Sequence, residues 1–150
     1  MSRVVLITGC STGIGRTVME RLTVSGHLVM ATARRAGSLK GVAASSGLVL
    51  DVIDSAATDF AVAAIPRRHG RIDVLLNDAG CAVRGVVEEV PGAAVEAMVD
   101  VNVVGVSRMV RPVAAVCDKR GGRGCPTGIV AITSACRGGL HGHCAVSRSG

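Results

Sequence analysis

Three closely spaced glycines near the N-terminus are the first residues whose spacing could support chemistry. Gly9, Gly13 and Gly15 directly follow a short apolar run. Gly9 permits a tight turn, Gly13 lets the backbone approach a bulky anion, and Gly15 allows a following helix to pack near the strand. The amides and the dipole at the start of that helix attract phosphate. The segment therefore predicts a turn that binds the diphosphate of a dinucleotide, although its spacing differs from the common G-x-G-x-x-G pattern.

Two arginines follow the second apolar run, where a dinucleotide site that prefers NAD usually carries an acidic residue on the ribose hydroxyls. These are Arg34 and Arg35, and no Asp or Glu stands beside them. A planar guanidinium suits the extra 2′-phosphate of NADP. The pair therefore favours NADP(H) over NAD(H). The alternative interpretation is two solvent-exposed loop arginines.

Short β-branched runs alternate with longer helical stretches along the chain. Strands are expected over 4–8, 28–32, 48–52, 72–76 and 129–133. Helices are expected over 14–25, from the N-cap pair Asp54-Ser55 to about Pro66, and over 93–116, where Pro112 bends or splits the helix. Apolar strands that do not alternate indicate burial on both faces, and strand–helix alternation indicates parallel pairing. The sequence therefore predicts one domain, 1–150, of the α/β class with a Rossmann-type doubly wound parallel sheet.

The composition limits the classes of protein that fit. Hydrophobic residues make up 49% of the chain, and Phe60 is the only aromatic residue, so we expect a core of small aliphatic side chains. No apolar run reaches the roughly 18–20 residues that a membrane span needs, and the N-terminal run is too short for a signal peptide. We therefore expect a cytoplasmic protein without a membrane segment.

Neither a metal site nor a nucleic-acid site is expected. The six cysteines lack paired spacing, which in a reducing compartment indicates free thiols. Cys136, His141, His143 and Cys144 lie close together but lack the usual ligand spacings. The net charge is +6, yet no nucleic-acid motif or stacking aromatic accompanies the basic clusters.

Further motifs follow the glycine turn in a fixed order. They are Leu50-Asp51-Val52, Asn77-Asp78-Ala79-Gly80, the segment 101–105 around Asn102, and the segment 129–134, which ends at Ser134. Together with Thr8-Gly9-x-x-x-Gly13-Ile14-Gly15, they resemble the short-chain dehydrogenase/reductase family over nearly the whole chain. Asp78 departs from the family pattern, which has asparagine in that place.

The resemblance implies an NAD(P)-dependent oxidoreductase that passes a hydride between the nicotinamide ring and an alcohol, ketone or aldehyde carbon. It implies Asn102 and Ser134 as catalytic positions. The expected cofactor-lining residues combine those that the resemblance implies with Arg34, which follows the second apolar run. They are Gly9, Ser11, Gly13, Ile14, Gly15, Arg34, Asp51, Val52, Asn77 and Ala79.

The family's Tyr-x-x-x-Lys motif has its closest match at the end of the chain. Cys144 stands in the tyrosine place and Arg148 in the lysine place, and the chain contains no tyrosine. A thiol with a pKa of about 8.5 can transfer protons, but its side chain is shorter than that of tyrosine. The adjacent His143, with a side-chain pKa of about 6.5, is the better surrogate for the tyrosine. Arg148 retains the positive charge and can bind ribose hydroxyls.

Two hypotheses about function follow. The first is an NADP(H)-dependent oxidoreductase acting on a small alcohol or carbonyl compound. The second is an inactive or decayed nucleotide-binding module that lacks the Tyr–Lys pair. The sequence ends at Gly150, soon after the fifth strand, so we expect a sheet that is incomplete at its C-terminal edge. The resemblance also implies a possible homodimer through the helix over 93–116.

Overall fold

The central feature of the fold is a parallel sheet. The computed structural model describes residues 2–41, 44–86, 88–118 and 128–131. Within these residues, five strands pair in the order β3-β2-β1-β4-β5, and every pair is parallel. The strands are β1 (Val4–Thr8), β2 (Leu28–Ala33), β3 (Ser46–Val49), β4 (Val74–Asn77) and β5 (Gly128–Ala131). The predicted α/β class with a parallel sheet is confirmed.

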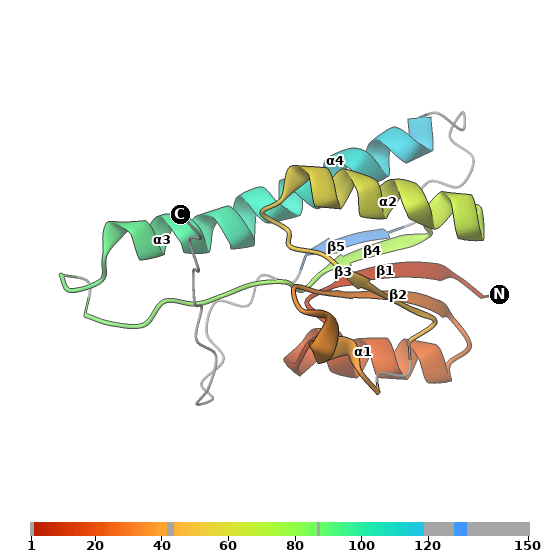
Figure 1. Cartoon of the computed structure of the whole chain (residues 1–150), viewed down its shortest axis with the longest axis horizontal. Helices are drawn as coiled ribbons and strands as arrows, with labels where there is room; N and C mark the ends of the chain where they lie inside the picture. The colour runs from red at the N-terminus through yellow and green to blue at the C-terminus, as the bar shows by residue number, and fades with distance from the viewer. Residues whose placement is uncertain (1, 42–43, 87, 119–127, 132–150) are drawn as a thin grey trace.

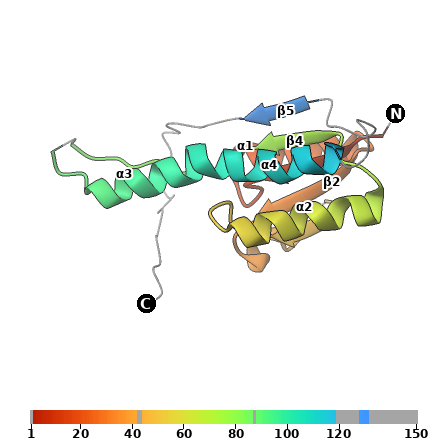
Figure 2. The ribbon, with the colours of Figure 1, turned by 90° about the horizontal axis from the view of Figure 1, so that it is seen from above.

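Helices cover both faces of this sheet. They are α1 (Gly13–Val24), α2 (Ser55–His69), α3 (Gly92–Val99) and α4 (Gly105–Asp118), with a short 3-10 turn, η1 (Ala36–Leu39), and a π turn, η2 (Asp100–Val104). The helix α1 lies on one face, and α2 and α4 lie on the other (Figure 1). Seen from above, α2 and α4 run side by side, while α3 extends past the end of the sheet (Figure 2). The doubly wound arrangement is therefore confirmed.

Two aliphatic cores lie on the two faces of the sheet. Every residue of β1 is buried, and alternate side chains enter opposite cores. Leu6 packs with α2 and α4 residues such as Val62 and Met109, whereas Ile7 packs with Met19 of α1. Burial on both faces explains why β1 is a continuous apolar run. Phe60 is 79% exposed, so the described cores are built from aliphatic, methionine and cysteine side chains, close to what the composition predicts.

The third and fourth strands differ from their predicted bounds. The pairing of β3 with β2 runs from Met30↔Ser46 to Ala33↔Val49 and ends where β2 ends, so the prediction of a strand over 48–52 is wrong at both ends. Leu50 and Val52 lie beyond the strand and are buried in the core, and the Leu50 amide still donates to the Ala33 carbonyl at 3.0 Å. β4 begins at Val74, two residues later than predicted. The carboxylate of Asp73 accepts a hydrogen bond from the Val4 amide at 2.7 Å, just before the β1–β4 pairing begins.

Two prolines that the sequence analysis placed at a helix end or a helix break lie inside helices. Pro66 is buried in the last turn of α2, which ends at His69 because Gly70 adopts φ +79° and donates its amide to the Pro66 carbonyl at 2.9 Å. Gly70 is therefore the stop signal. Pro112 does not split α4, which is continuous from Gly105 to Asp118. The regular α-helical pattern changes instead at the π turn η2, between α3 and α4.

Other sequence expectations are tested only in part. No helix in the described ranges is long and apolar enough to cross a membrane. In the same ranges no group of three or more His, Cys, Asp or Glu side chains could hold a metal ion. The Cys136 to Cys144 cluster lies outside the described residues, as do the last two residues of the predicted strand over 129–133.

Candidate functional site

The candidate site lies where the strand order changes direction. From β1 the chain proceeds to β2 and β3 on one side, then returns to place β4 on the other side of β1. The carboxyl edge at such a reversal is where open α/β sheets bind ligands. Gly9 follows β1, Arg34 follows β2 and Asn77 closes β4. Because parallel strands end at the same edge, the fold gathers these predicted cofactor residues there.

The glycine turn is held against the end of β4 by close backbone packing. Gly9 has φ +79°, and a Cβ on it would lie 2.7 Å from the Ala79 amide nitrogen. A Cβ on Gly15 would lie 2.6 Å from an Asp78 carboxylate oxygen and 2.8 Å from the Gly9 carbonyl oxygen. Glycine is therefore required at both positions by the approach of neighbouring atoms. This geometry agrees with the tight turn expected at Gly9 and the close helix packing expected at Gly15.

Gly13, the first residue of α1, has open space around it, unlike Gly9 and Gly15. It has φ +67°, and a Cβ on it would meet no atom of the described residues within 4 Å. The N-cap, Thr12, makes no side-chain capping bond, and the first turn of α1 contains no acidic residue. The start of α1 therefore combines open space with a helix terminus that attracts anions. These are the requirements for holding a diphosphate.

Thr8 joins the glycine turn to β4 through its hydroxyl. The Thr8 side chain is 1% exposed, and its Oγ1 accepts hydrogen bonds from the Asp78 and Ala79 amides, each at 3.1 Å. The Asp78 carboxylate oxygen Oδ2 in turn accepts a hydrogen bond from the Gly15 amide at 2.7 Å. The motif over 77–80 thus fixes the start of α1 relative to β1. Neither Thr8 nor Asp78 was among the predicted site residues, although a lone hydroxyl at the end of an apolar strand was a usable signal for Thr8.

The thiol of Cys10 lies inside the same turn. Its amide donates to the Thr32 carbonyl at 2.8 Å, which ties the turn to β2. Burial raises the pKa of the Cys10 thiol to about 11, and the charge of Asp78 adds to the rise. The thiol therefore stays neutral near pH 7 and packs as a small apolar group.

Asn102 projects from the π turn toward the loop after β4. Its Oδ1 accepts the Cys81 amide at 2.9 Å, and its Nδ2 donates to the Cys81 carbonyl at 2.8 Å. The oxygen and the nitrogen of the Asn102 side-chain amide are therefore both hydrogen-bonded to the backbone of Cys81. A Cβ on Gly80 would lie 3.1 Å from Asn102 Oδ1, so this approach also favours glycine. Single π turns within α-helices are found frequently at functional sites.

The remaining predicted cofactor residues lie around this edge in different settings. Arg34 is exposed directly after β2. Asp51 uses one carboxylate oxygen to accept the Ile53 amide at 3.3 Å, and Val52 is buried against Gly105. Asn77 is 3% exposed, and its two side-chain amide atoms have no hydrogen-bond partner among the described residues. Ser11 and Ile14 are partly buried in the turn and in the first turn of α1, respectively.

Comparison with known proteins identifies the family. The profile described as "short chain dehydrogenase" matches residues 3–142. The chain belongs to the short-chain dehydrogenase family. It is 34% identical over 109 residues to the 3-oxoacyl-(acyl-carrier-protein) reductase MabA of Mycobacterium tuberculosis, covering 73% of this chain and 43% of that protein. It is 36% identical over 113 residues to the serine 3-dehydrogenase of Agrobacterium fabrum. That match covers 70% of this chain and 45% of the relative.

Solved short-chain dehydrogenases share the fold. A variant of actinorhodin polyketide ketoreductase, solved with NADPH, superposes with a TM-score of 0.72 at 33% identity, covering 80% of this chain and 50% of that one. A short-chain dehydrogenase from Streptomyces avermitilis superposes with a TM-score of 0.74 at 32% identity. The match covers 81% of this chain and 46% of that one. The chain spans less than half the length of the curated relatives that it matches.

Within the short-chain dehydrogenase frame, the described residues include one of the four predicted catalytic positions. Asn102 is placed by η2 against the loop that follows β4. Ser134, Cys144 and Arg148 lie outside the described residues, so their roles stay predictions. The family binds NAD or NADP, and the open space at Gly13 beside the first amides of α1 fits such a group.

Proposed function

We propose that residues 1–150 form an NAD(P)-binding unit that holds the cofactor at the carboxyl edge of β1 and β4, with NADP(H) preferred. One observation carries this proposal. Gly13 opens to empty space at a helix start whose N-cap residue, Thr12, makes no side-chain capping bond, whereas Gly9 and Gly15 on either side are closely packed. Diphosphate oxygens would occupy the space at Gly13, held by backbone amides and the dipole of α1.

The proposed reaction is hydride transfer between an alcohol and a ketone or aldehyde. The bound nicotinamide supplies or accepts the hydride. Arg34, exposed after β2, would pair with the 2′-phosphate. Asn102 would position the loop at Cys81 beside the reacting groups, since its side chain holds that loop to the long helix. Ser134 would orient the substrate oxygen, as the family resemblance implies. By their names, one relative reduces a 3-oxoacyl group on acyl carrier protein and another dehydrogenates serine, which supports alcohol–carbonyl chemistry for this chain.

The alternative is a nucleotide-binding module without turnover. It is favoured by Cys144 and Arg148, which stand where the family has tyrosine and lysine. A cysteine side chain is too short to reach the substrate oxygen from the backbone position of a tyrosine, because proton transfer needs approach to about 2.6–3.2 Å. In this alternative the cofactor site remains, and only the proton transfer is lost.

We further propose that the protein is cytoplasmic and forms a homodimer through the helix over 93–116. Three valines at four-residue spacing are exposed along α3 and η2, namely Val95, Val99 and Val103. Residues at this spacing share one helix face. An exposed aliphatic face of this kind is typical of association surfaces.

The cofactor preference is tested by titrating the purified chain with NADPH and NADH. We expect Arg34→Ala to weaken NADPH binding about tenfold and to leave NADH binding unchanged, because it removes one charge-assisted contact to the 2′-phosphate. Arg67→Ala, an exposed arginine in the last turn of α2, serves as the control and should change neither affinity. Equal losses for both cofactors would contradict the proposed role of Arg34.

The same protein is then assayed for NADPH oxidation with a panel of ketones and aldehydes. Oxidation that depends on the carbonyl compound supports the oxidoreductase. Saturable NADPH binding without oxidation supports the module without turnover. A folded chain that binds neither cofactor would contradict both.

A further inference from the structure

The start of α1 receives a capping contact from a distant part of the chain. Asp78 directly follows β4, and its Oδ2 accepts the amide of Gly15, the third residue of α1, at 2.7 Å. The first four amides of a helix have no acceptor within the helix, and the residue just before it usually caps them with its side chain. Thr12 holds that position and makes no side-chain capping bond. Asp78 therefore takes the place of the local cap.

Helix α2 shows the ordinary form of the same contact. Its N-cap residue is Asp54, whose Oδ1 accepts the amide of Ala57, the third residue of α2, at 3.0 Å. Each helix thus presents its third amide to an aspartate carboxylate. The carboxylate comes from the preceding residue in α2 and from the end of β4 in α1. Asp54 is exposed, whereas Asp78 is half-buried, so water and salt screen the charge of Asp78 less.

The carboxylate of Asp78 brings a negative charge to the glycine turn. A hydrogen bond from an amide favours the ionised form of a carboxyl group. Burial raises the pKa of the Cys10 thiol to about 11, and the charge of Asp78 adds to that rise, so this charge acts inside the turn. Gly13, where we place the diphosphate, lies two residues before Gly15 in the first turn of α1. The carboxylate and a bound diphosphate would therefore be two anions at one helix start.

Two opposite effects follow from this placement. While the site is empty, the carboxylate satisfies the Gly15 amide and interacts favourably with the positive end of the α1 dipole. A diphosphate that binds at Gly13 meets the same carboxylate as a like charge, which lowers the affinity for the cofactor. One residue therefore stabilises the fold and weakens the binding.

We propose that Asp78 caps α1 from the end of β4 and, through its charge, keeps the affinity for the dinucleotide below the value that a neutral residue would give. The capping role stands on the contact with Gly15, whereas the effect on affinity rests on the proposed function. Asp78 is thus a positioning residue of the cofactor site.

The capping role is tested without cofactor, by urea unfolding followed through far-UV circular dichroism. Asp78→Ala removes the acceptor of the Gly15 amide, and Asp54→Ala removes the matched acceptor of the Ala57 amide. We expect each substitution to lower the midpoint of unfolding by about 0.5 M urea, as the loss of a helix cap does in a small domain. An unchanged midpoint in Asp78→Ala, beside a lowered one in Asp54→Ala, would overturn the capping role.

The effect on affinity is tested with Asp78→Asn, titrated with NADPH and NADH through cofactor fluorescence. Asparagine keeps an oxygen that can accept the Gly15 amide, removes the charge, and is the residue that the family pattern has in this place. We expect NADPH to bind about threefold to tenfold more tightly than it binds the native chain, because one like charge is gone. NADH should gain about as much, since both cofactors carry the diphosphate. A loss of packing or of the cap would instead weaken binding.

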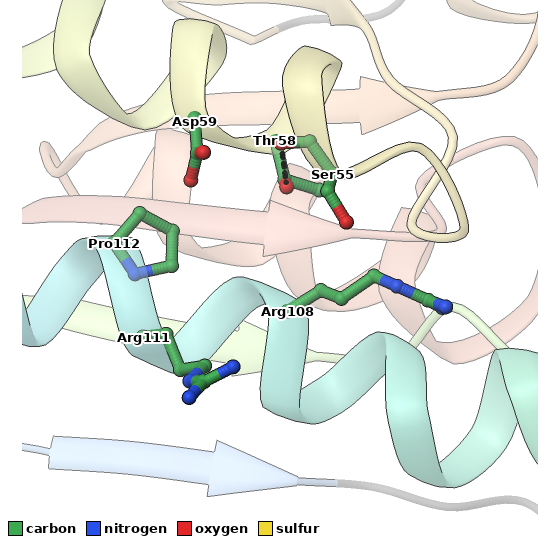
Figure 3. Close-up of a pocket in the computed structure, with 6 residues that line it drawn as sticks. All are labelled: Ser55, Thr58, Asp59, Arg108, Arg111 and Pro112. Atoms are coloured by element: carbon green, nitrogen blue, oxygen red, sulfur yellow. Dashed lines mark hydrogen bonds between the residues drawn. The ribbon is translucent and has the colours of Figure 1, made fainter.

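Asp59→Asn is the control for net charge. Asp59 is exposed on α2 and lines the surface cleft that this helix forms with α4, outside the proposed cofactor residues (Figure 3). Its substitution should leave both affinities unchanged. Equal tightening in this variant would overturn the effect on affinity, as would unchanged or weaker binding by a folded Asp78→Asn. A native chain that binds neither cofactor would contradict the proposed function and the effect on affinity, and the unfolding comparison would still decide the capping role.

Discussion

Replacing Gly9 with alanine is expected to lower the free energy of unfolding by about 3 kcal/mol. Two costs add in this variant. A non-glycine residue at φ +79° is strained by about 1–3 kcal/mol, and the new Cβ would lie 2.7 Å from a backbone nitrogen that cannot rotate away. The contact is with Ala79, so relieving it would separate the ends of β1 and β4. The chain contains no tryptophan or tyrosine, so the measurement is urea unfolding followed by far-UV circular dichroism.

Gly37→Ala provides the matched control for this substitution. Gly37 lies in the 3-10 turn η1, has no positive φ, and has open space around it. Its replacement should change the free energy of unfolding by less than about 0.5 kcal/mol, as is usual for exposed sites. Equal destabilisation of the two variants would contradict the role assigned to the contact between Gly9 and Ala79.

Thr8→Val is expected to destabilise the fold by about 2–4 kcal/mol although it keeps the shape of the side chain. The Thr8 hydroxyl accepts two amides, from Asp78 and Ala79, in a place that is 1% exposed. Valine would leave both donors without their acceptor, and each unsatisfied buried group costs about 1–3 kcal/mol. Chemical unfolding, followed by circular dichroism, measures the effect.

Thr8→Ser separates the hydroxyl from the methyl group. Serine retains the acceptor and loses one buried methyl, which costs about 1 kcal/mol. The serine variant should therefore be more stable than the valine variant. The reverse order would mean that packing, and not the two hydrogen bonds, explains why threonine ends β1.

Several features were predictable because independent signals agreed. The strand over 4–8, the glycine turn and the following helix combine a continuous apolar run with glycines at the turn and a helical pattern behind them. The structure places these elements at Val4–Thr8 and Gly13–Val24. Where one signal stood alone, the prediction was wrong. Pro66 suggested a helix end, but the helix continues to His69, where Gly70 ends it.

The contacts that build the site could not be predicted, because they join residues far apart in the chain. Asp78 accepts the amide of Gly15, 63 positions away, and Asn102 holds Cys81 from a π turn that no sequence pattern marked. Burial also hid the end of the third strand, because Leu50 and Val52 are apolar core residues although the strand ends at Val49. The carboxyl edge itself was predictable, since strands of a parallel sheet end together.

The proposed diphosphate site is tested most directly by comparing NADPH binding by the chain and by its Gly13→Asp variant, measured through the fluorescence of the cofactor. Aspartate is one of the few residues that tolerates positive φ, and it has open space at this position, so the fold should persist by circular dichroism. Its charge would face the diphosphate. We expect saturable binding by the chain and at least tenfold weaker binding by the variant, a loss of about 1.4 kcal/mol. Equal affinities in two folded proteins would contradict the proposed site.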